Sequence, residues 1–178
     1  MENLRIAKHR TKHPLFLAGL LGSPLKGAEI GVERGTTTQQ LLTSFPDLHI
    51  IAVDPWLDGY EDWDLAECRR EFDLRAKAFP RRITVFDTDS ISASKMVADD
   101  SLDFVFIDAV HTYEAVIADI AAWSPKVKPG GFITGHDYGF KDTGVKRAVD
   151  EVYPNARIDT FSSVWWIRQI KTCMHIQV

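Results

Sequence analysis

The amino-acid sequence predicts an α/β fold: a doubly wound, seven-stranded sheet that is mostly parallel and ends in an antiparallel C-terminal hairpin. Apolar segments of strand length alternate with segments of helix length, which is typical of βαβ units. One apolar segment, residues 103–107, reads Asp-Phe-Val-Phe-Ile without alternation, as expected for a central strand that is covered on both faces. Residues 157–161 and 164–168, joined by Ser162-Ser163, predict the edge hairpin.

The other elements follow in order along the chain. Thr112 is a typical helix N-cap, and Pro125 with Pro129-Gly130-Gly131 is expected to end that helix and reorient the chain. The expected parallel strands are residues 27–32, 49–53, 82–86, 103–107 and 131–134, and the expected helices are residues 36–44, 62–78, 90–98, 112–123 and 143–152.

A single domain is expected for residues 1–178, because a chain of this length fits one hydrophobic core. The core is expected over residues 27–168, after a helical N-terminal segment (1–26) and before a C-terminal tail (169–178). Little chain outside this core is left to shape a substrate pocket. The pocket is therefore either open or completed by a second copy of the chain in a homodimer.

Composition restricts the partners. A formal net charge of −4 gives no electrostatic footprint for nucleic acid, and 45% hydrophobic residues is ordinary for a globular protein. Two cysteines, with no C-x-x-C pair, indicate neither a disulfide framework nor a cysteine zinc site. No apolar run approaches the ~20 residues of a membrane span, and the N-terminus lacks the apolar region of a signal peptide. We therefore expect a cytoplasmic protein with no membrane partner.

The most informative stretch is residues 28–36, where the first predicted strand runs into a turn with two glycines four residues apart. It contains Glu29, Gly31 and Gly35, and the second strand ends in Asp54. Glycines let the backbone approach a ligand, and a carboxylate at the second strand end can accept hydrogen bonds from ribose hydroxyls. The turn lacks the G-x-G-x-x-G spacing of dinucleotide sites. Because Glu29 suits a cation better than a pyrophosphate, the pattern favours a cationic nucleoside cofactor.

This Glu-x-Gly-x-x-x-Gly pattern resembles the first motif of class I S-adenosylmethionine-dependent methyltransferases, which have a Rossmann-like sheet. The resemblance implies S-adenosyl-L-methionine as cofactor, with adenine near Trp56, Asp89 and Ser90. Core packing is the alternative for Trp56, and a helix N-cap is the alternative for Asp89-Ser90. By this resemblance the cofactor-binding residues are Glu29, Gly31, Gly35, Thr36, Asp54, Trp56, Asp89, Ser90 and Asp108.

A second group of polar residues follows the fourth and fifth strands. Asp108 and His111 come after the fourth strand, and His136-Asp137 after the fifth. Adjacent parallel strands lie about 4.8 Å apart, so these side chains are expected to meet, with water or a divalent cation offsetting their charge. The alternatives are a helix cap for Asp108, a carbonyl-bonded helix residue for His111 and a turn for His136-Asp137.

The wording Phe-Ile-Asp-x-x-His-x-Tyr-Glu, then Lys-Pro-Gly-Gly-x-x-x-Gly-His-Asp-Tyr, resembles the metal-dependent small-molecule O-methyltransferases of the catechol and antibiotic-sugar types. The resemblance covers residues 24–140. It implies a divalent metal, magnesium or manganese, on Asp108, His136 and Asp137, with His111 as general base. The chain departs from the pattern at His136, where the family usually has an acid, and imidazole prefers softer cations than magnesium.

Together these features predict an enzyme that transfers a methyl group from S-adenosylmethionine to a hydroxyl of a small molecule, a sugar or a phenol. Three rivals remain open. One is an NAD(P)-type oxidoreductase, against which the glycine spacing argues. Another is a metal-dependent hydroxylase, in which His111 would enter the metal shell. The third is a non-catalytic subunit that only binds the cofactor.

Overall fold

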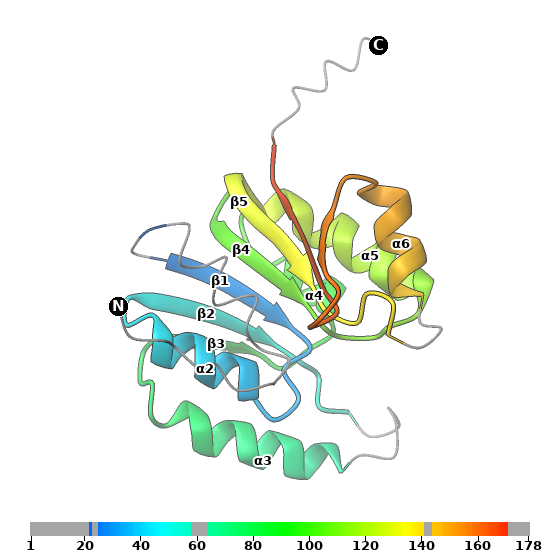
Figure 1. Cartoon of the computed structure of the whole chain (residues 1–178). Helices are drawn as coiled ribbons and strands as arrows, with labels where there is room; N and C mark the ends of the chain where they lie inside the picture. The colour runs from blue at the N-terminus through cyan, green and yellow to red at the C-terminus, as the bar shows by residue number, and fades with distance from the viewer. Residues whose placement is uncertain (1–21, 23–24, 58–63, 141–143, 171–178) are drawn as a thin grey trace.

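The computed structural model describes residues 22, 25–57, 64–140 and 144–170, and its centre is one seven-stranded sheet (Figure 1). The strands are β1 (Leu25–Ile30), β2 (Leu48–Val53), β3 (Ile83–Phe86), β4 (Leu102–Ile107), β5 (Val127–Gly135), β6 (Arg157–Asp159) and β7 (Val164–Arg168). Their order is β3-β2-β1-β4-β5-β7-β6. The pairs from β3 to β5 are parallel, and β7 is antiparallel to β5 and β6, so the predicted sheet is confirmed.

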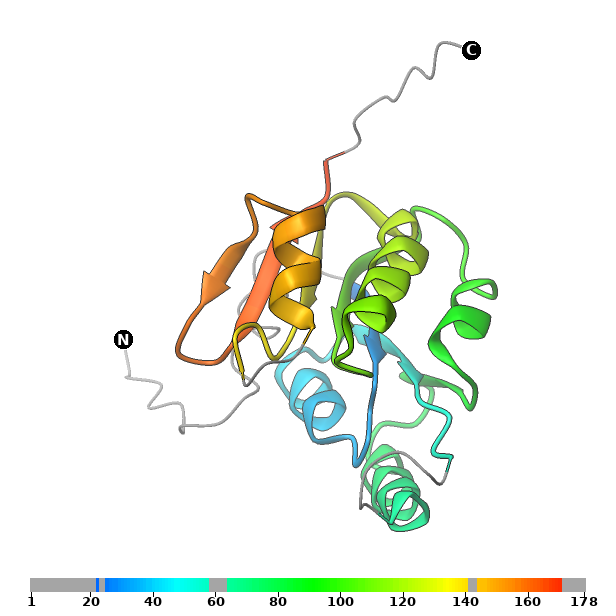
Figure 2. The same cartoon turned by 90° about the vertical axis from the view of Figure 1, so that its right-hand side faces the viewer.

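Helices cover both faces of the sheet. Figures 1 and 2 show α2 (Thr36–Ser44) and α3 (Leu65–Ala76) on one face. On the other face lie α4 (Ser90–Ser94), α5 (Tyr113–Trp123) and α6 (Val145–Val152), and a short 3-10 helix, Ser124–Lys126, follows α5. Each face has its own buried cluster: Ile50 packs with the α2–α3 side, and its neighbour Ile51 packs with the α4–α6 side. This alternation is the period of two that a strand imposes.

The N-terminal prediction was wrong at two residues. Leu25 and Lys26 belong to β1 rather than to a helical segment, and apart from Gly22 the rest of that segment lies outside the described residues. The strand ends at Ile30, two residues earlier than predicted, because Gly31 has a φ of +87° and leaves the extended conformation. The sheet edge therefore begins directly at the glycine turn.

The prediction for Pro129-Gly130-Gly131 was also wrong. These residues lie inside β5, which begins at Val127, and do not form the turn that ends the preceding helix. The register between β4 and β5 shifts after Val127, so this segment forms a bulge. Gly130 has a φ of +85° there, and proline is tolerated in a strand at such a bulge.

Several helices and strands are shorter than predicted, and side-chain hydrogen bonds mark some of their ends. Asp64 caps α3 by accepting the Glu67 N–H at 2.9 Å, so this helix begins at Leu65. The carboxylate of Asp159 accepts the Phe161 N–H at 3.0 Å and ends β6 two residues early. Helix α4 stops at Ser94 rather than at residue 98. The first predicted residues of the helices at 62–78 and 143–152 lie outside the described residues.

Candidate active site

The glycine turn that follows β1 packs against the loop after β4. The Gly31 N–H donates to the Val53 carbonyl at 2.9 Å. A Cβ at Gly31 would lie 2.7 Å from the Cα of Ala109 and closer still to the carbonyl oxygen of Asp108. Glycine is therefore required here by both its positive φ and the close approach of a second backbone. The turn expected to hold a cofactor thus touches the loop that carries Asp108.

Gly35 has a different role. It is the N-cap of α2 with a φ of +74°, and its N–H donates to the Val32 carbonyl at 2.8 Å. A Cβ there would lie 2.6 Å from the ring of Phe72 in α3. Thr36, the first residue of α2, is exposed. Gly35 therefore lets the chain enter α2 beside Phe72, directly after the turn that follows β1.

Asp54 holds the glycine turn in place. Its Oδ2 accepts the N–H groups of Val32 and Glu33, each at 2.9 Å, and its Oδ1 accepts the Trp56 N–H at 2.8 Å. A carboxylate has about four acceptor sites, so three bonds leave about one for a ligand hydroxyl. The residue predicted to bind ribose therefore also organises the turn.

Trp56 packs into the core. It is buried, its Nε1–H donates to the Glu33 carbonyl at 2.8 Å, and its ring lies 5.2 Å from the ring of Phe72. The guanidinium of Arg69 lies 4.5 Å above the indole centroid. Both surroundings match the packing alternative that the sequence left open for Trp56.

Glu29 is a buried carboxyl group beneath the turn. It accepts a hydrogen bond from the Thr38 hydroxyl of α2. Burial raises the pKa of Glu29 to about 8, the Thr38 hydrogen bond opposes the shift, and the charges of Asp108 and Asp54 add to it. A cation bound against Glu29 would favour the ionised carboxylate.

Asp89 and Ser90 start α4, and both are engaged there. Asp89 is the N-cap and accepts the Ser92 N–H at 2.9 Å, which matches the capping alternative. The Ser90 hydroxyl donates to Asp119 of α5 and accepts the Trp123 Nε1–H at 2.9 Å. Sequence reasoning missed Asp119, although an acid inside the otherwise apolar stretch Ala-Val-Ile-Ala-Asp-Ile-Ala-Ala-Trp was a usable signal.

The polar residues after β4 and β5 lie together, as the strand pairing predicted. The His111 Nε2 lies 3.4 Å from Oδ1 of Asp108 and 3.1 Å from Oδ2 of Asp137. The His136 Nδ1 lies 3.0 Å from Oδ1 of Asp137 and 3.7 Å from Oδ1 of Asp108. His136 and Asp137 are buried, whereas His111 and Asp108 are half-buried. Burial raises the pKa of Asp108, and the His111 hydrogen bond opposes this shift.

A metal-compatible group lies within this cluster. Ligand atoms of Asp108, His111 and Asp137 all lie within 4.8 Å of one another. Two carboxylates and an imidazole form a donor set that suits manganese or iron, and magnesium if water completes its shell. The predicted ligands were Asp108, His136 and Asp137, and His111 was predicted to be the base. The group found here has His111 where the prediction has His136. Asp137 adopts a φ of +58°, and its Oδ2 lies 3.1 Å from Nε2 of His111.

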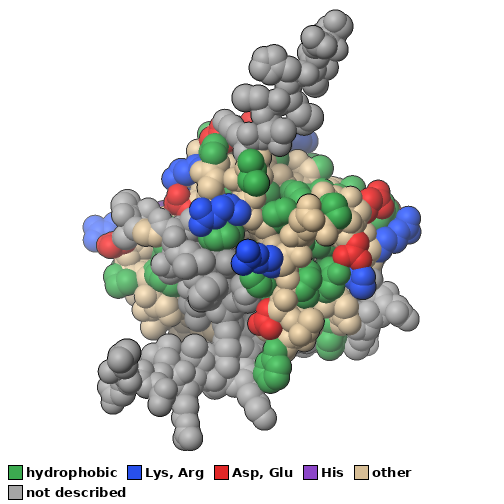
Figure 3. Space-filling view, turned by 45° about the horizontal axis from the view of Figure 1, so that its top comes forward, with side chains coloured by type: hydrophobic (Ala, Val, Ile, Leu, Met, Phe, Trp, Pro, Cys, Tyr) green, Lys and Arg blue, Asp and Glu red, His purple; other side chains and the backbone are tan. Residues whose placement is uncertain are grey.

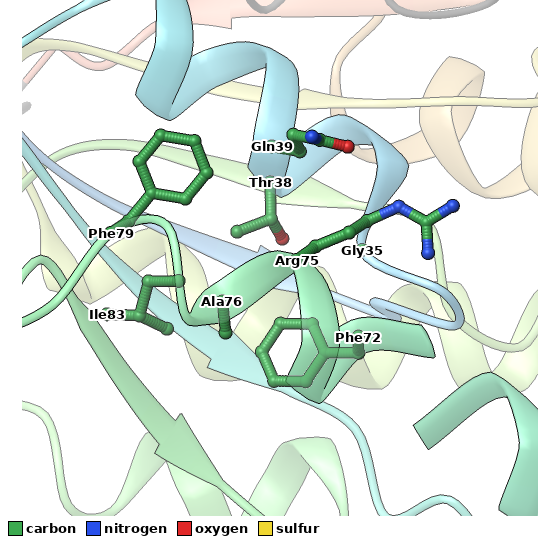
Figure 4. Close-up of a pocket in the computed structure, with 8 residues that line it drawn as sticks. All are labelled: Gly35, Thr38, Gln39, Phe72, Arg75, Ala76, Phe79 and Ile83. Carbon is green, nitrogen blue, oxygen red and sulfur yellow. The ribbon is translucent and has the colours of Figure 1, made fainter. Parts of the chain in front are cut away.

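A separate shallow crevice, too small to enclose a water molecule, lies between α2 and α3 (Figure 4). Its lining is mostly apolar, with Phe72, Phe79 and Ile83 facing Thr38 and the stem of Arg75. None of the acidic or imidazole side chains after β4 and β5 contributes to this lining. The crevice therefore does not coincide with the polar cluster.

The strand order, the glycine turn on β1 and the acid after β2 define a class I S-adenosylmethionine-dependent methyltransferase. The match of residues 28–138 to a family model described as "Methyltransferase domain" shows that the chain belongs to this methyltransferase family. No curated protein matches the sequence. Among the described residues, no helix is long and apolar enough to span a membrane.

Solved structures with little sequence identity share this fold. A putative rRNA-methylase from Clostridium thermocellum is 13% identical with a TM-score of 0.70, covering 92% of this chain and 99% of that chain. The O-methyltransferase NovP is 19% identical with a TM-score of 0.62, covering 88% and 76%. The Burkholderia thailandensis 1,6-didemethyltoxoflavin-N1-methyltransferase, solved with S-adenosylhomocysteine, is 15% identical with a TM-score of 0.61, covering 89% and 77%. Similarity at this level shows the fold alone.

Proposed function

We propose that this methyltransferase transfers the methyl group of S-adenosylmethionine to a hydroxyl oxygen of a small molecule, a sugar or a phenol. The contact between Gly31 and the Asp108 backbone carries this proposal. It sets the cofactor turn directly against the loop with Asp108 and His111. A methyl donor on the turn and a hydroxyl beside His111 would therefore be neighbours, as in-line transfer requires.

The cofactor would lie across the ends of β1, β2 and β3. In the proposal the carboxylate of Glu29 stabilises the cationic part of S-adenosylmethionine, and Asp54 uses its remaining acceptor capacity for a ribose hydroxyl. The N-terminus of α2, at Gly35 and Thr36, directly follows the turn after β1 and would border the cofactor. Trp56, Asp89 and Ser90 would shape the adenine side mainly by holding the loops that contact it, because their polar groups are engaged within the protein.

The donor set after β4 and β5 fits a divalent cation, and Asp108 and Asp137 would hold it together with the imidazole of His136, which leaves His111 to act as the base. Such a cation, magnesium or manganese, supplies Lewis acidity that orients the acceptor hydroxyl and lowers its pKa. His111 accepts the hydroxyl proton at Nε2 as general base. The oxygen then forms the new C–O bond while the methyl–sulfur bond breaks. That electron pair returns to sulfur and gives S-adenosylhomocysteine.

Charge favours a small acceptor over a nucleic acid. The chain has a net charge of −4, and its polar cluster contains two carboxylates that would repel phosphate. On the face shown in Figure 3, basic, acidic and hydrophobic side chains are interspersed without a continuous basic patch among the coloured residues. We therefore propose a neutral hydroxyl compound as the acceptor.

A product assay tests this function. The protein would be incubated with S-adenosylmethionine, Mg²⁺ or Mn²⁺ and a panel of catechols, hydroxylated sugars, amines and ribosomal RNA, and methylated products would be identified by mass spectrometry. We expect O-methylated sugars or phenols, and their loss with Asp108→Asn. Asp99→Asn is the matched control, since Asp99 is an exposed acid paired with Lys126. Methylation confined to amines or RNA would contradict the proposal.

A further inference from the structure

Helix α6 lies beside α5 on the face of the sheet opposite α2 and α3 (Figure 2). Its buried side, with Val145, Ala148 and Val149, packs into the core, so the helix is anchored independently of the active-site loops. Four of its other side chains contact the tyrosines that follow the β4 and β5 loop residues: Lys146, Arg147, Asp150 and Glu151. One helix is therefore attached to the two segments that carry the polar cluster.

The first attachment is to the loop after β4 and to Tyr113, the first residue of α5, which directly follows that loop. The N–H of Gly144, just before α6, donates to the carbonyl of His111 at 2.9 Å. A Cβ at Gly144 would lie 2.7 Å from the carbonyl carbon of Thr112 and closer still to the backbone N of Tyr113. The hydroxyl of Tyr113 donates to Glu151 of α6 at 2.8 Å, and the Arg147 guanidinium lies 3.9 Å above its ring. The backbone of His111 is thus seated directly on the start of α6.

The second attachment is to the loop after β5. Tyr138 follows Asp137 in sequence, and its hydroxyl donates to Oδ1 of Asp150 in α6 at 2.6 Å. Lys146 also donates to Asp150, and its ammonium lies 5.3 Å above the Tyr138 ring. Asp150 and Glu151 are neighbours in one helix, so Tyr138 of the loop after β5 and Tyr113, the first residue of α5, bind adjacent positions of α6.

These contacts matter because strand pairing reaches His136 but stops short of His111 and Asp137. The last hydrogen bond that joins the ends of β4 and β5 runs from the His136 N–H to the Ile107 carbonyl at 3.1 Å. Beyond it, strand pairing no longer fixes the distance between His111 and Asp137. The Tyr138 N–H holds the loop after β5 to the Ser163 carbonyl at 2.9 Å, but this bond does not reach the loop after β4. Besides the direct contact of His111 with Asp137, α6 bonds to both segments.

We propose that α6 is a brace that fixes the separation of His111 and Asp137, and that Gly144, Tyr113 and Tyr138 are positioning residues for the site. None of these three side chains or backbone groups needs to touch substrate. The inference rests on the proposed function in one respect: it takes the cluster to bind a cation and His111 to accept a proton. The brace concerns only how α6 holds the two segments, so it can be tested without measuring turnover.

The first test uses Gly144→Ala. The added methyl group must displace α6 from the β4 loop, so we expect Mn²⁺ affinity, measured by calorimetry, to fall about tenfold or more, as for changes in groups that orient metal ligands. The affinity for S-adenosylhomocysteine should stay within about twofold. Gly130→Ala is the matched control: it has space for a Cβ but a φ of +85°, so it strains the backbone far from the cluster. An equal loss of Mn²⁺ affinity in both variants would overturn the brace.

The second test does not depend on any metal. In the double variant Tyr113→Phe/Tyr138→Phe, hydrogen exchange of the backbone amides in residues 107–113 and 136–140 should accelerate about three- to tenfold. Tyr153→Phe is the control, because it removes a tyrosine hydroxyl, at the same end of α6, that pairs at 2.7 Å with Ser124, which lies in neither loop. Unchanged exchange in both loops would refute the brace. If wild-type protein binds no Mn²⁺ yet exchange accelerates as expected, the brace stands and the metal part of the proposed function fails.

Discussion

The Nε2 of His111 lies 3.1 Å from Oδ2 of Asp137, so an imidazole from the loop after β4 contacts a carboxylate from the loop after β5. Asp108 completes the arrangement at 3.4 Å from the same nitrogen. A proton acceptor in this position lies between the two acids that would hold a cation. Removing the imidazole would therefore alter both proton transfer and the balance of charge.

His111→Ala is expected to lower kcat about 10²- to 10⁴-fold, the contribution of a general base. Affinity for S-adenosylhomocysteine should be unchanged, because the glycine turn contacts the β4 loop through the Asp108 backbone and not through His111. His111→Lys should retain part of the rate with an optimum at higher pH. Steady-state kinetics with calorimetry checks this. Normal turnover at saturating Mn²⁺ with lost Mn²⁺ affinity would make His111 a ligand instead.

Removal of metal should stop methyl transfer and leave cofactor binding intact. Chelator treatment is expected to abolish the reaction, and Mg²⁺ or Mn²⁺ should restore it, because Asp108 and Asp137 can hold a cation beside the acceptor. In Asp137→Asn neither metal should restore the rate fully. Full activity in excess chelator would show that the base works without a metal.

Asp54→Ala should weaken S-adenosylhomocysteine binding at least about tenfold, since hydrogen bonds to charged groups contribute about 1.5–3 kcal/mol each. The structure adds a second expectation: the melting temperature should also fall, because Val32 and Glu33 lose their acceptor. Asp54→Asn keeps an oxygen for those two N–H groups and should melt closer to wild type. Calorimetry and thermal unfolding separate the two effects, and unchanged binding would reject the site after β2.

Glu29 should make cofactor binding depend on pH. Its pKa of about 8 means that the carboxyl group is mostly neutral at pH 6, and a cation bound against it favours the ionised form. Binding S-adenosylmethionine below pH 8 should therefore release a proton, and affinity should rise with pH, by at most about tenfold per unit. Calorimetry in chelator at pH 6, 7 and 8 measures this. Glu29→Gln should remove the dependence, and a flat wild-type profile would contradict the role.

The buried carboxyl group of Asp119 should make the free energy of unfolding fall as pH rises. Burial raises its pKa from 3.8 to about 6, so between these values the folded protein holds a proton that the unfolded chain has released. The free energy of unfolding should thus fall as pH rises from 4 to 7, by up to about 3 kcal/mol relative to Asp119→Asn. Urea unfolding of both proteins at pH 4.5 and pH 7 checks the sign. A wild-type protein that gains stability relative to Asp119→Asn over this range would contradict it.

The sheet could be predicted because apolar runs of strand length, and the helix-length segments between them, are visible in short stretches of sequence. The run at 103–107 identified the central strand, and parallel pairing then placed His111 near Asp137. Pro129-Gly130-Gly131 misled because a bulge and a turn use the same residues, and only the partner strand decides between them.

The partner of each polar side chain could not be predicted. Asp89 and Ser90 have types that suit a ligand or a cap equally, and their partners in α4 and α5 come from tertiary packing. Nothing in the sequence marks Gly144, because its requirement comes from a backbone that approaches from α5. The roles of such residues depend on three-dimensional neighbours.

The packing of Gly31 against the backbone of Asp108 has a consequence for how this enzyme can diversify. Neither loop can be lengthened or rerouted alone, because a single methyl group already has no room between them. During evolution, a change in the loop that carries Asp108 would therefore require a matching change in the cofactor-binding turn. New acceptors would be gained through segments that border the edge without sharing this contact, such as the turn around Phe161, whose side chain is 87% exposed.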